Sequence, residues 1–388
     1  MKILNREKMS AGICFVLLAF GALFLLGMSF RARPPENINI LIMQASRPVE
    51  LCSNEICAVK AQNGLLAFTI GAGSKFEVGI YKDDILINNK RYKGDYLTIT
   101  SSGLIDVGGR KLKGIIKLRK TVKDNRTCLL VINRLDIEDY IKGVVPNEVY
   151  PEWDMEALKA QAVAARSYAF YHVINNEGTP YDLSSVSQNY AGAGTETPRT
   201  NSAVDATRGE ILIYKGKPLC SFFSTVCGGC TEIPENVWVK FKDNFPKGVK
   251  CRHCRNAPDY KWQAVLSMSE IESKLRSAGF KLGTLKSIRP SKRSKYGKRI
   301  TELMLTHSSG RLNVRINDFR IALGSKRVKS GLFKLKKRGK RVYFGGKGHG
   351  HGVGMCQYGA LTLAKKGYNY KKILKYYYPG AKIEKNRI

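Results

Sequence analysis

Acidic residues are scarce in this chain. Its 388 residues include 31 Asp and Glu against 66 Lys and Arg, which gives a formal net charge of +35 at pH 7. A field of that sign favours an anionic partner or surface. Nucleic acid, phospholipid head groups and acidic wall polymers all meet that condition. The length is sufficient for one large domain, or for two to three smaller ones with real cores.

Charged residues are absent from residues 9–30. At about 1.5 Å per residue, a helix of that length crosses a hydrocarbon core of about 30 Å. Lys2, Arg6 and Lys8 precede the run and no A-x-A-like site follows it, which favours an uncleaved anchor over a cleaved signal. We therefore predict a cytoplasmic stub and transmembrane helix over residues 1–30, giving a single-pass membrane protein. The remaining chain is then extracytoplasmic, and we expect no nucleic-acid partner.

The sequence pattern of the remaining residues predicts an α+β fold with several regions. Residues 31–37 contain two prolines and predict a linker. Residues 38–134 hold short runs of Ile, Val, Leu and Tyr between Gly, Asn and Asp, which predicts a β-rich accessory domain. Residues 135–388 predict a mixed α/β core built around an Ala-rich buried helix. Within it, residues 260–342 form a basic insert, which fits either a solvated face or a groove for a polyanion.

Glu148 begins the most informative stretch. It lies among Val, Pro, Tyr and Trp in a predicted loop that follows a short helix over residues 135–143. Apolar neighbours disfavour the charged form of a carboxyl group, which is how a Glu becomes a proton donor near neutral pH. Small residues then recur at helical spacing, with Arg166 as a polar exception that needs a carboxylate, a carbonyl or a ligand. A core helix preceded by a surface Glu is the structural alternative.

Two further stretches contain candidate ligand-binding residues. Gln188 and Tyr190 lie in a long loop and offer hydrogen bonds and a stacking face to a sugar, or else form a polar loop with one Tyr packed down. His349 and His351 lie in a glycine-rich stretch, where an extended strand would direct both to one side. They could bind metal, donate protons or hydrogen-bond a ligand. No strand–loop–helix phosphate signature accompanies the glycines.

Two C-x₂-C pairs, Cys227 with Cys230 and Cys251 with Cys254, are separated by twenty residues. Paired knuckles at such spacing predict a structural zinc site, since zinc favours four soft ligands in a tetrahedron. Two disulfides or a redox pair are the alternatives in an oxidising compartment. His253 is a possible replacement for one of the cysteines.

Five ordered blocks together resemble the stage II sporulation protein D family, which includes the amidase enhancers. The blocks are VVPNEVYPEWDMEALKAQAVAARSYA, SQNYAGAGTETPRTNSAVDATRGEILIYKGKP, STVCGGCTE, GHGHGVGMCQYGA and YYYPGAKI. The resemblance implies a peptidoglycan lytic transglycosylase that cleaves between N-acetylmuramic acid and N-acetylglucosamine. It also implies that Glu148 is the catalytic residue, that Arg166 supports activity and that a zinc site lies near STVCGGC.

The resemblance leaves two functions open. A lytic transglycosylase manages with one carboxylate, because the muramic acid 6-hydroxyl is an internal nucleophile, whereas ordinary glycosidases usually need two. The other function is a non-enzymatic enhancer that binds wall and stimulates a partner amidase. The expected partners are glycan strands, anionic wall polymers and the membrane. For either function, the residues expected to contact substrate are Gln188, Tyr190, His349, His351, Gln357 and Tyr358.

Overall fold

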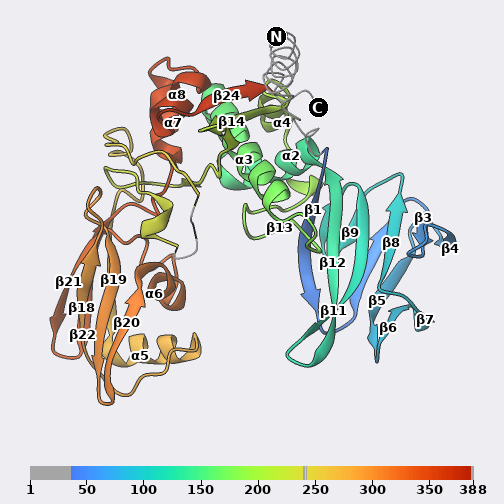
Figure 1. Cartoon of the computed structure of the whole chain (residues 1–388), viewed down its shortest axis with the longest axis horizontal. Coiled ribbons are helices and arrows are strands. Elements are labelled where there is room, and N and C mark those ends of the chain that lie inside the picture. Colours follow the sequence, from blue (N-terminus) through green and yellow to red (C-terminus); the bar gives the residue numbers. More distant parts are fainter. Residues whose placement is uncertain (1–35, 239–240, 242, 386–388) are drawn as a thin grey trace, which may run out of the picture. The chain divides into compact units, whose positions relative to one another are not determined.

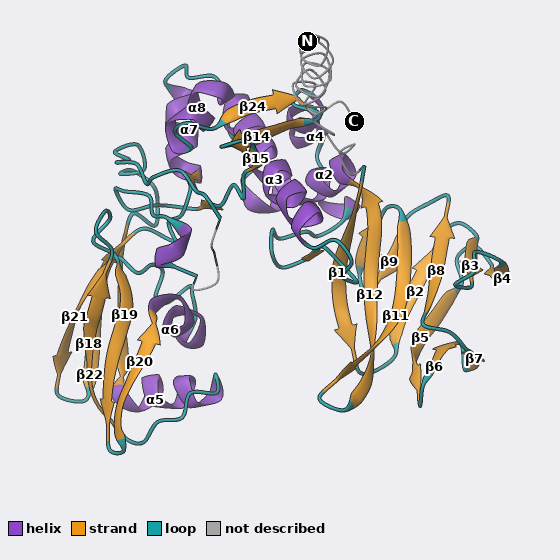
Figure 2. Cartoon of the chain, in the orientation of Figure 1, coloured by secondary structure: helices purple, strands orange, loops and turns teal. Residues whose placement is uncertain are grey.

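The computed structural model describes residues 36–238, 241 and 243–385 (Figure 1). The predicted cytoplasmic stub and membrane anchor lie outside these residues, as does nearly all of the predicted linker. Among the helices that are described, none is both long enough and apolar enough to cross a membrane. The described part mixes strands and helices (Figure 2), so the predicted α+β class is confirmed.

The N-terminal region is built from two β-sheets. A seven-stranded sheet has the order β13-β1-β12-β11-β8-β3-β4, and a six-stranded sheet has the order β10-β9-β2-β5-β6-β7. Buried positions alternate with mostly half-buried ones along β1 and the first half of β11, as expected for strands with one face on a core. The strands are β1 (Asn37–Ala45), β2 (Val49–Ser53), β3 (Cys57–Lys60), β4 (Leu66–Ile70), β5 (Lys75–Tyr81), β6 (Asp84–Ile87), β7 (Lys90–Tyr92), β8 (Tyr96–Ser101), β9 (Ile105–Val107), β10 (Arg110–Leu112), β11 (Ile115–Lys123), β12 (Arg126–Asp136) and β13 (Leu183–Ser184).

The helix that follows β12 directly is the first of a group of five. Asp136 caps α2 by accepting hydrogen bonds from two backbone N–H groups of its first turn, and Asp154 caps α3 in the same way with one. The alanine face of α3 is buried, as its spacing predicts. The helices are α2 (Ile137–Glu148), α3 (Met155–Asn175), α4 (Pro198–Asp205), α7 (Gln357–Lys365) and α8 (Tyr370–Tyr377), with short 3₁₀ turns at Ala193–Thr195 and Pro234–Asn236.

The predicted end of the helix before Glu148 is wrong. The sequence predicted a short helix over residues 135–143, but α2 continues to Glu148 with Pro146 inside its last turn. Proline is poorly tolerated within a helix because it removes a backbone donor. Here the helix continues past it, and Val149 still donates its N–H to the carbonyl of Val145. Glu148 is therefore the last residue of a helix, not part of a loop.

Short strands connect these helices to the cysteine-bearing loops. β14 (Glu210–Tyr214) pairs with β15 (Lys217–Pro218) on one side and β24 (Lys382–Lys385) on the other, and β16 (Phe223–Ser224) pairs with β23 (Met355–Cys356). The β16–β23 pairing is parallel, so it brings residues far apart in the sequence next to each other.

The basic insert has its own hydrophobic core, which includes Trp262, Leu266, Phe319 and Phe344. Two three-stranded sheets, β17-β22-β21 and β18-β19-β20, surround it together with two helices. The elements are β17 (Lys261–Ser267), α5 (Met268–Ser277), β18 (Leu285–Arg293), β19 (Ile300–His307), β20 (Gly310–Arg315), α6 (Ile316–Leu323), β21 (Phe333–Arg338) and β22 (Arg341–Lys347).

Candidate active site

Glu148 faces a cleft of about 410 Å³. Asn189 donates a hydrogen bond from Nδ2 to Glu148 Oε1 at 3.1 Å, and Gln357 Nε2 lies 3.5 Å from Oε2. Gln357 also donates to the backbone carbonyl of Glu148 at 3.2 Å. The carboxyl group is thus fixed by two amides from distant parts of the chain. The residues lining the cleft are Pro146, Asn147, Glu148, Val149, Tyr150, Trp153, Asn189, Thr225, Pro258, Asp259, His349, Gln357 and Tyr358.

The electrostatic setting of Glu148 suits a proton donor. Burial raises the pKa of its carboxyl group to about 7, although the hydrogen bonds from Gln357 and Asn189 act in the opposite direction. Burial disfavours the charged form of an acid, whereas donors aimed at the carboxylate favour it. At neutral pH a substantial fraction of Glu148 is therefore protonated. Such a group can give a proton and take one back near the working pH.

Aromatic side chains form one side of this cleft. The rings of Trp153 and Tyr358 meet edge to face with centroids 5.0 Å apart, and Tyr150 lies 6.0 Å from Trp153. Tyr150 is exposed and Tyr358 is partly exposed. Tyr358 was expected at the site from its position in the glycine-rich block, and it lines the cleft. Exposed aromatic rings in a cleft offer flat apolar surfaces on which a sugar ring can stack.

A second carboxylate, Asp259, lies in the same cleft but is already paired. His349 Nδ1 lies 2.7 Å from one oxygen of Asp259, and Lys329 forms an ion pair with the other. Lys329 first and His349 second hold the pKa of this carboxyl below its ordinary value. Glu148 and Asp259 thus have opposite pKa shifts. Sequence reasoning missed Asp259 and Lys329, because neither lies in a recognisable motif.

The two histidines do not share one side as predicted. His349 lines the cleft, whereas His351 packs against Trp238 with ring centroids 5.0 Å apart. Gly350 between them has a φ of +100°, so the stretch is not an extended strand. Burial, together with the nearby guanidinium groups of Arg320 and Arg299, lowers the pKa of His351 to about 3. His351 is therefore a neutral packing residue.

Gln188 and Tyr190 also lie away from the cleft, which corrects their predicted role in substrate binding. Gln188 donates to the carbonyl of Ala165 at 3.2 Å and accepts from the hydroxyl of Tyr140 at 3.1 Å. Tyr190 donates to Asn133 at 2.8 Å, and both side chains are buried. The residue between them, Asn189, reaches Glu148 instead. The structural alternative, a polar loop with Tyr190 packed down, fits the observed contacts.

Arg166, which was expected to need a carboxylate, a carbonyl or a ligand, pairs with a buried carboxylate. Its guanidinium makes a two-pronged ion pair with Glu138, at 2.8 Å and 2.7 Å, and both side chains are 1% exposed. Its remaining hydrogen bonds reach Thr207 and the carbonyls of Val204 and Glu210. Within the described structure, its hydrogen bonds go to none of the groups that line the cleft. The geometry gives Arg166 a role in joining α2, α3 and α4.

Four buried cysteines meet at one point, but they are not the predicted four. The Sγ atoms of Cys227, Cys251, Cys254 and Cys356 all lie within 4.8 Å of one another. Cys230 belongs elsewhere, since its Sγ contacts the carbonyl of Thr231. The spacing of the C-x₂-C pairs could not reveal Cys356, which lies more than one hundred residues further along the chain. The one sequence feature that pointed to Cys356 was its position as a lone cysteine within an apolar, glycine-rich block.

The donor set fits a closed zinc site better than disulfides. All four thiols are free, and the Sγ atoms of Cys227 and Cys254 are 3.6 Å apart, compared with about 2.05 Å in a disulfide. Four buried sulfur ligands match the tetrahedral thiolate sets of structural zinc sites. His253 is not part of the cluster, because its ring packs against Tyr376. A metal held here would have no open position for an activated water.

Comparison with known proteins gives a consistent assignment. A family model described as "Stage II sporulation protein" matches residues 125–214, which include Glu148, and a domain of unknown function (DUF8618) matches residues 240–354. An uncharacterized protein of Brachyspira hyodysenteriae is 38% identical over 80% of each chain.

Two relatives have informative names. Stage II sporulation protein D of Bacillus subtilis is 30% identical over 66% of this chain and 77% of its own length. The amidase enhancer of the same organism is 30% identical over 63% of this chain but only 40% of its own length. The resemblance noted from the motifs is confirmed, and the chain belongs to the SpoIID family of stage II sporulation proteins.

Proposed function

We propose that this protein acts on the bacterial cell wall as a lytic transglycosylase that cleaves peptidoglycan between N-acetylmuramic acid and N-acetylglucosamine. The observation that carries this proposal is the position of Glu148, at the end of α2 in an aromatic-sided cleft with its pKa raised to about 7. The names of the related sporulation and amidase-enhancer proteins support a wall-related role at a coarser level.

In the proposed reaction, Glu148 acts twice. It donates its proton to the glycosidic oxygen as the bond from that oxygen to the muramic acid C1 breaks. The ionised Glu148 then accepts the proton of the muramic acid 6-hydroxyl, whose oxygen forms the new bond to C1. The products are a 1,6-anhydro end and a free N-acetylglucosamine hydroxyl, and no water is consumed.

The state of Asp259 favours this one-carboxylate scheme over ordinary hydrolysis. A hydrolase that uses two carboxylates needs the second one free as a base or nucleophile. Asp259 is instead held by Lys329 and His349. Its charge and the neighbouring His349 are better suited to binding and orienting a sugar substituent beside Glu148.

The cysteine cluster has a structural role in this proposal. Cys227, Cys251, Cys254 and Cys356 would hold one zinc ion, whose chemistry is to cross-link the loops that carry them. Cys356 immediately precedes Gln357, which contacts Glu148. The cluster thereby fixes one of the two amides that orient the catalytic carboxyl group.

A second function, supported by the similarity to the amidase enhancer, is stimulation of a partner amidase without glycan cleavage. Both functions require residues 36–385 to lie outside the cytoplasm, which fits the predicted anchor.

The deciding experiment compares wild type, Glu148→Gln and the control Glu152→Gln on purified glycan strands. Glu152 is an exposed carboxylate four residues away. We expect Glu148→Gln to reduce release of anhydro-muramic products by about 10²–10⁴-fold, the usual contribution of a general acid–base group, while the control retains activity. Because Glu148 must be protonated at the start of the reaction, wild-type activity should fall as the pH rises above about 7.

Two outcomes would overturn the proposal. Equal rates for wild type and Glu148→Gln would remove Glu148 from the mechanism. A wild-type protein that produces no anhydro ends but accelerates a purified amidase would establish the enhancer function instead.

A further inference from the structure

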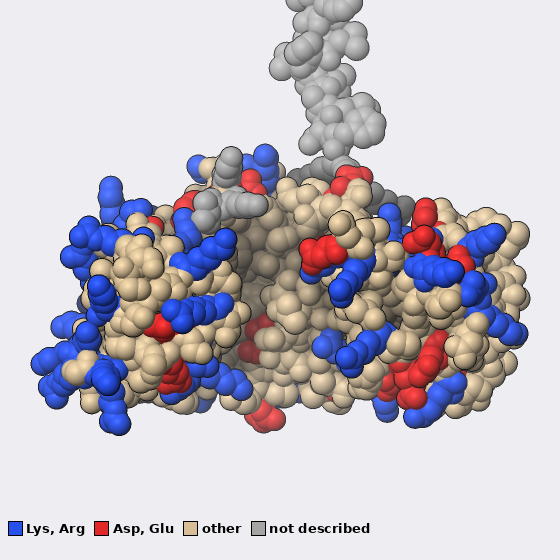
Figure 3. All heavy atoms as spheres, turned by 90° about the horizontal axis from the view of Figure 1, so that it is seen from below, with Lys and Arg blue, Asp and Glu red and all other residues tan. Residues whose placement is uncertain are grey.

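The basic insert carries most of the charge of the whole chain. Residues 261–347 include 24 Lys and Arg but four Asp and Glu, so they contribute +20 of the net +35. Figure 3 shows these cations gathered over the part of the molecule that contains β18 to β22, at the left of the view. Charge alone is equally typical of a solvated surface. The shape of that surface and the pairing of its cations are what distinguish a binding site.

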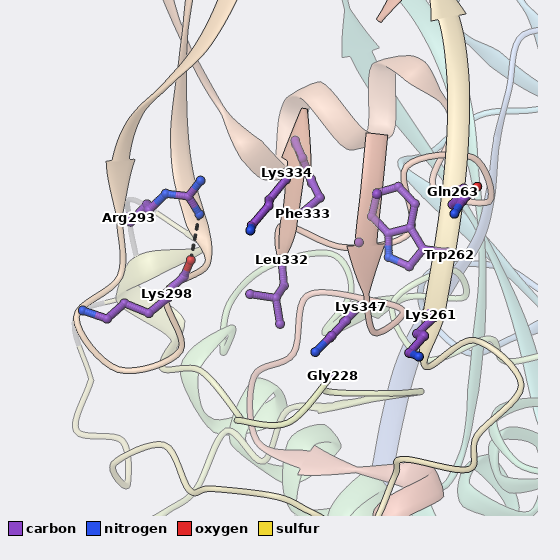
Figure 4. A pocket seen from close by; sticks show the side chains of 12 residues that line it. Gly228, Lys261, Trp262, Gln263, Arg293, Lys298, Leu332, Phe333, Lys334 and Lys347 are labelled. Carbon is purple, nitrogen blue, oxygen red and sulfur yellow. Dashed lines mark hydrogen bonds between the residues drawn. The ribbon is translucent and has the colours of Figure 1, made fainter. Parts of the chain in front are cut away.

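A groove of about 730 Å³ lies along the sheet β17-β22-β21 (Figure 4). Five of the twelve residues that line it are cations, and none is an acid: Lys261, Arg293, Lys298, Lys334 and Lys347. Figure 4 shows Lys334 and Lys347 extending into the space between Arg293 and Trp262. The groove thus brings together like charges from four strands and one hairpin loop.

These five charges are not compensated within the described structure. None of them forms an ion pair with a described carboxylate, although cations elsewhere in the insert do: Lys329 pairs with Asp259 and Arg327 with Glu270. Arg293 instead donates a hydrogen bond to the carbonyl of Lys298 at 3.0 Å, which closes the hairpin loop on itself. Mutual repulsion among such groups is relieved when an anion occupies the groove.

The floor of the groove is open because of a glycine. Gly345 lies on the central strand, in register with Gln263 on one side and Lys334 on the other. A Cβ added at Gly345 would meet no atom within 4 Å, so the position opens onto empty space. At the next residue, Gly346, a Cβ would strike the ring of Trp262. The absent side chain at Gly345 leaves room for an extended chain to lie across the sheet.

The chemistry of the lining selects among anionic polymers. Four of the five cations are lysines, which bind phosphate groups as compact point charges, and Arg293 alone can make the two-pronged contact that both carboxylate and phosphate accept. The lining aromatic residues, Trp262 and Phe333, are 5% and 4% exposed, so they offer no platform on which sugars or bases could stack. We propose that this groove binds a polyol-phosphate chain, a polymer of phosphodiester-linked polyols such as bacterial walls contain.

This binding site is separate from the Glu148 cleft and does not depend on the proposed reaction. Its test is binding of a fluorescent poly(glycerol phosphate) oligomer to the full chain at low salt. The first variant, Lys261→Gln with Lys334→Gln, removes two groove charges. The second, Gly345→Leu, fills the floor without changing the charge. The control, Lys281→Gln with Lys326→Gln, removes two exposed charges that do not line the groove.

We expect the first variant to bind about tenfold more weakly, since hydrogen bonds to charged groups typically contribute that much or more. Gly345→Leu should also lose affinity, while the control stays within about twofold of wild type. Thermal melts establish that each variant is folded.

Three results would overturn the proposal. An equal loss of affinity in the control and groove variants would show that binding of the oligomer depends on the total charge of the protein. Stronger, groove-dependent binding of single-stranded DNA of matched charge would identify a nucleic-acid site. Displacement of the oligomer by neutral glycan strands would make the groove a sugar subsite. All are read by binding, so they are independent of whether Glu148 cleaves glycan.

Discussion

Asn189 shows how a single backbone angle decides which side chain reaches the active site. Its φ of +44° directs its amide towards Glu148, while Gln188 and Tyr190 on either side are buried in the core. Asn tolerates this left-handed conformation better than most residues. The polar residue between two buried ones is therefore the member of this loop that contacts Glu148.

Replacing Asn189 should change the pH dependence of the reaction. The Asn189 amide donates to the carboxylate of Glu148 and lowers its pKa, so Asn189→Ala should raise that pKa further above about 7. The basic limb of the pH–rate profile should then move to higher pH, while the maximal rate falls as Glu148 loses its orientation. The measurement is anhydro-muramic product release across pH 5–9, a range of about two units on either side of the Glu148 pKa.

The matched control for that experiment is Ser187→Ala, an exposed position in the same loop. It should leave the profile in place. A profile for Asn189→Ala that moves to lower pH, or does not move, would contradict the assignment of Asn189 as a donor to Glu148.

At the level of elements, the ion pair between Arg166 and Glu138 connects α2, which ends at Glu148, to the helix that follows it in the chain. The pair joins α3 to α2, and its further hydrogen bonds reach α4 and the start of β14. Breaking a buried pair leaves an uncompensated charge, which typically costs about 3–5 kcal/mol of folding stability. We expect Arg166→Met to lower the free energy of unfolding by that amount.

Denaturant unfolding measures this effect, with Lys142→Met as its control. Lys142 pairs with the half-exposed Asp205 on the neighbouring surface, and such pairs contribute about 0–1 kcal/mol. If Arg166→Met were as stable as wild type but inactive, Arg166 would have a direct role in the chemistry.

Some features of this helical region could be predicted from the sequence and others could not, for physical reasons. The buried face of α3 was predictable because alanines at helical spacing leave few other arrangements. The end of α2 was not, because Pro146 indicates a break that the surrounding packing overrides. The motif resemblance identified Glu148, but its neighbours Asp259 and Gln357 come together only through tertiary folding. Arg166 was expected to need a carboxylate, a carbonyl or a ligand, and helix spacing could not identify Glu138 as its carboxylate.

At the level of the whole molecule, the cysteine cluster joins parts of the chain that are far apart in sequence. If Cys356 is the fourth ligand, Cys356→Ser should reduce both the zinc content and the melting temperature of the purified full chain. Cys230→Ser should change neither, because its thiol lies outside the cluster. Elemental analysis and thermal melts of the two variants, produced in parallel, test this difference. Zinc loss in Cys230→Ser with retention in Cys356→Ser would restore the ligand set inferred from knuckle spacing.

The same cluster also lies where the basic insert begins and ends. The insert leaves the core soon after Cys254 and returns shortly before Cys356, whose Sγ atoms lie within 4.8 Å of each other. A segment whose two ends meet can change in length or sequence away from those ends without displacing what lies on either side, as inserted domains generally can. Under the proposed functions, evolution can therefore alter the groove of the insert without altering the reaction at Glu148, as long as Lys329 keeps its ion pair with Asp259 in the cleft.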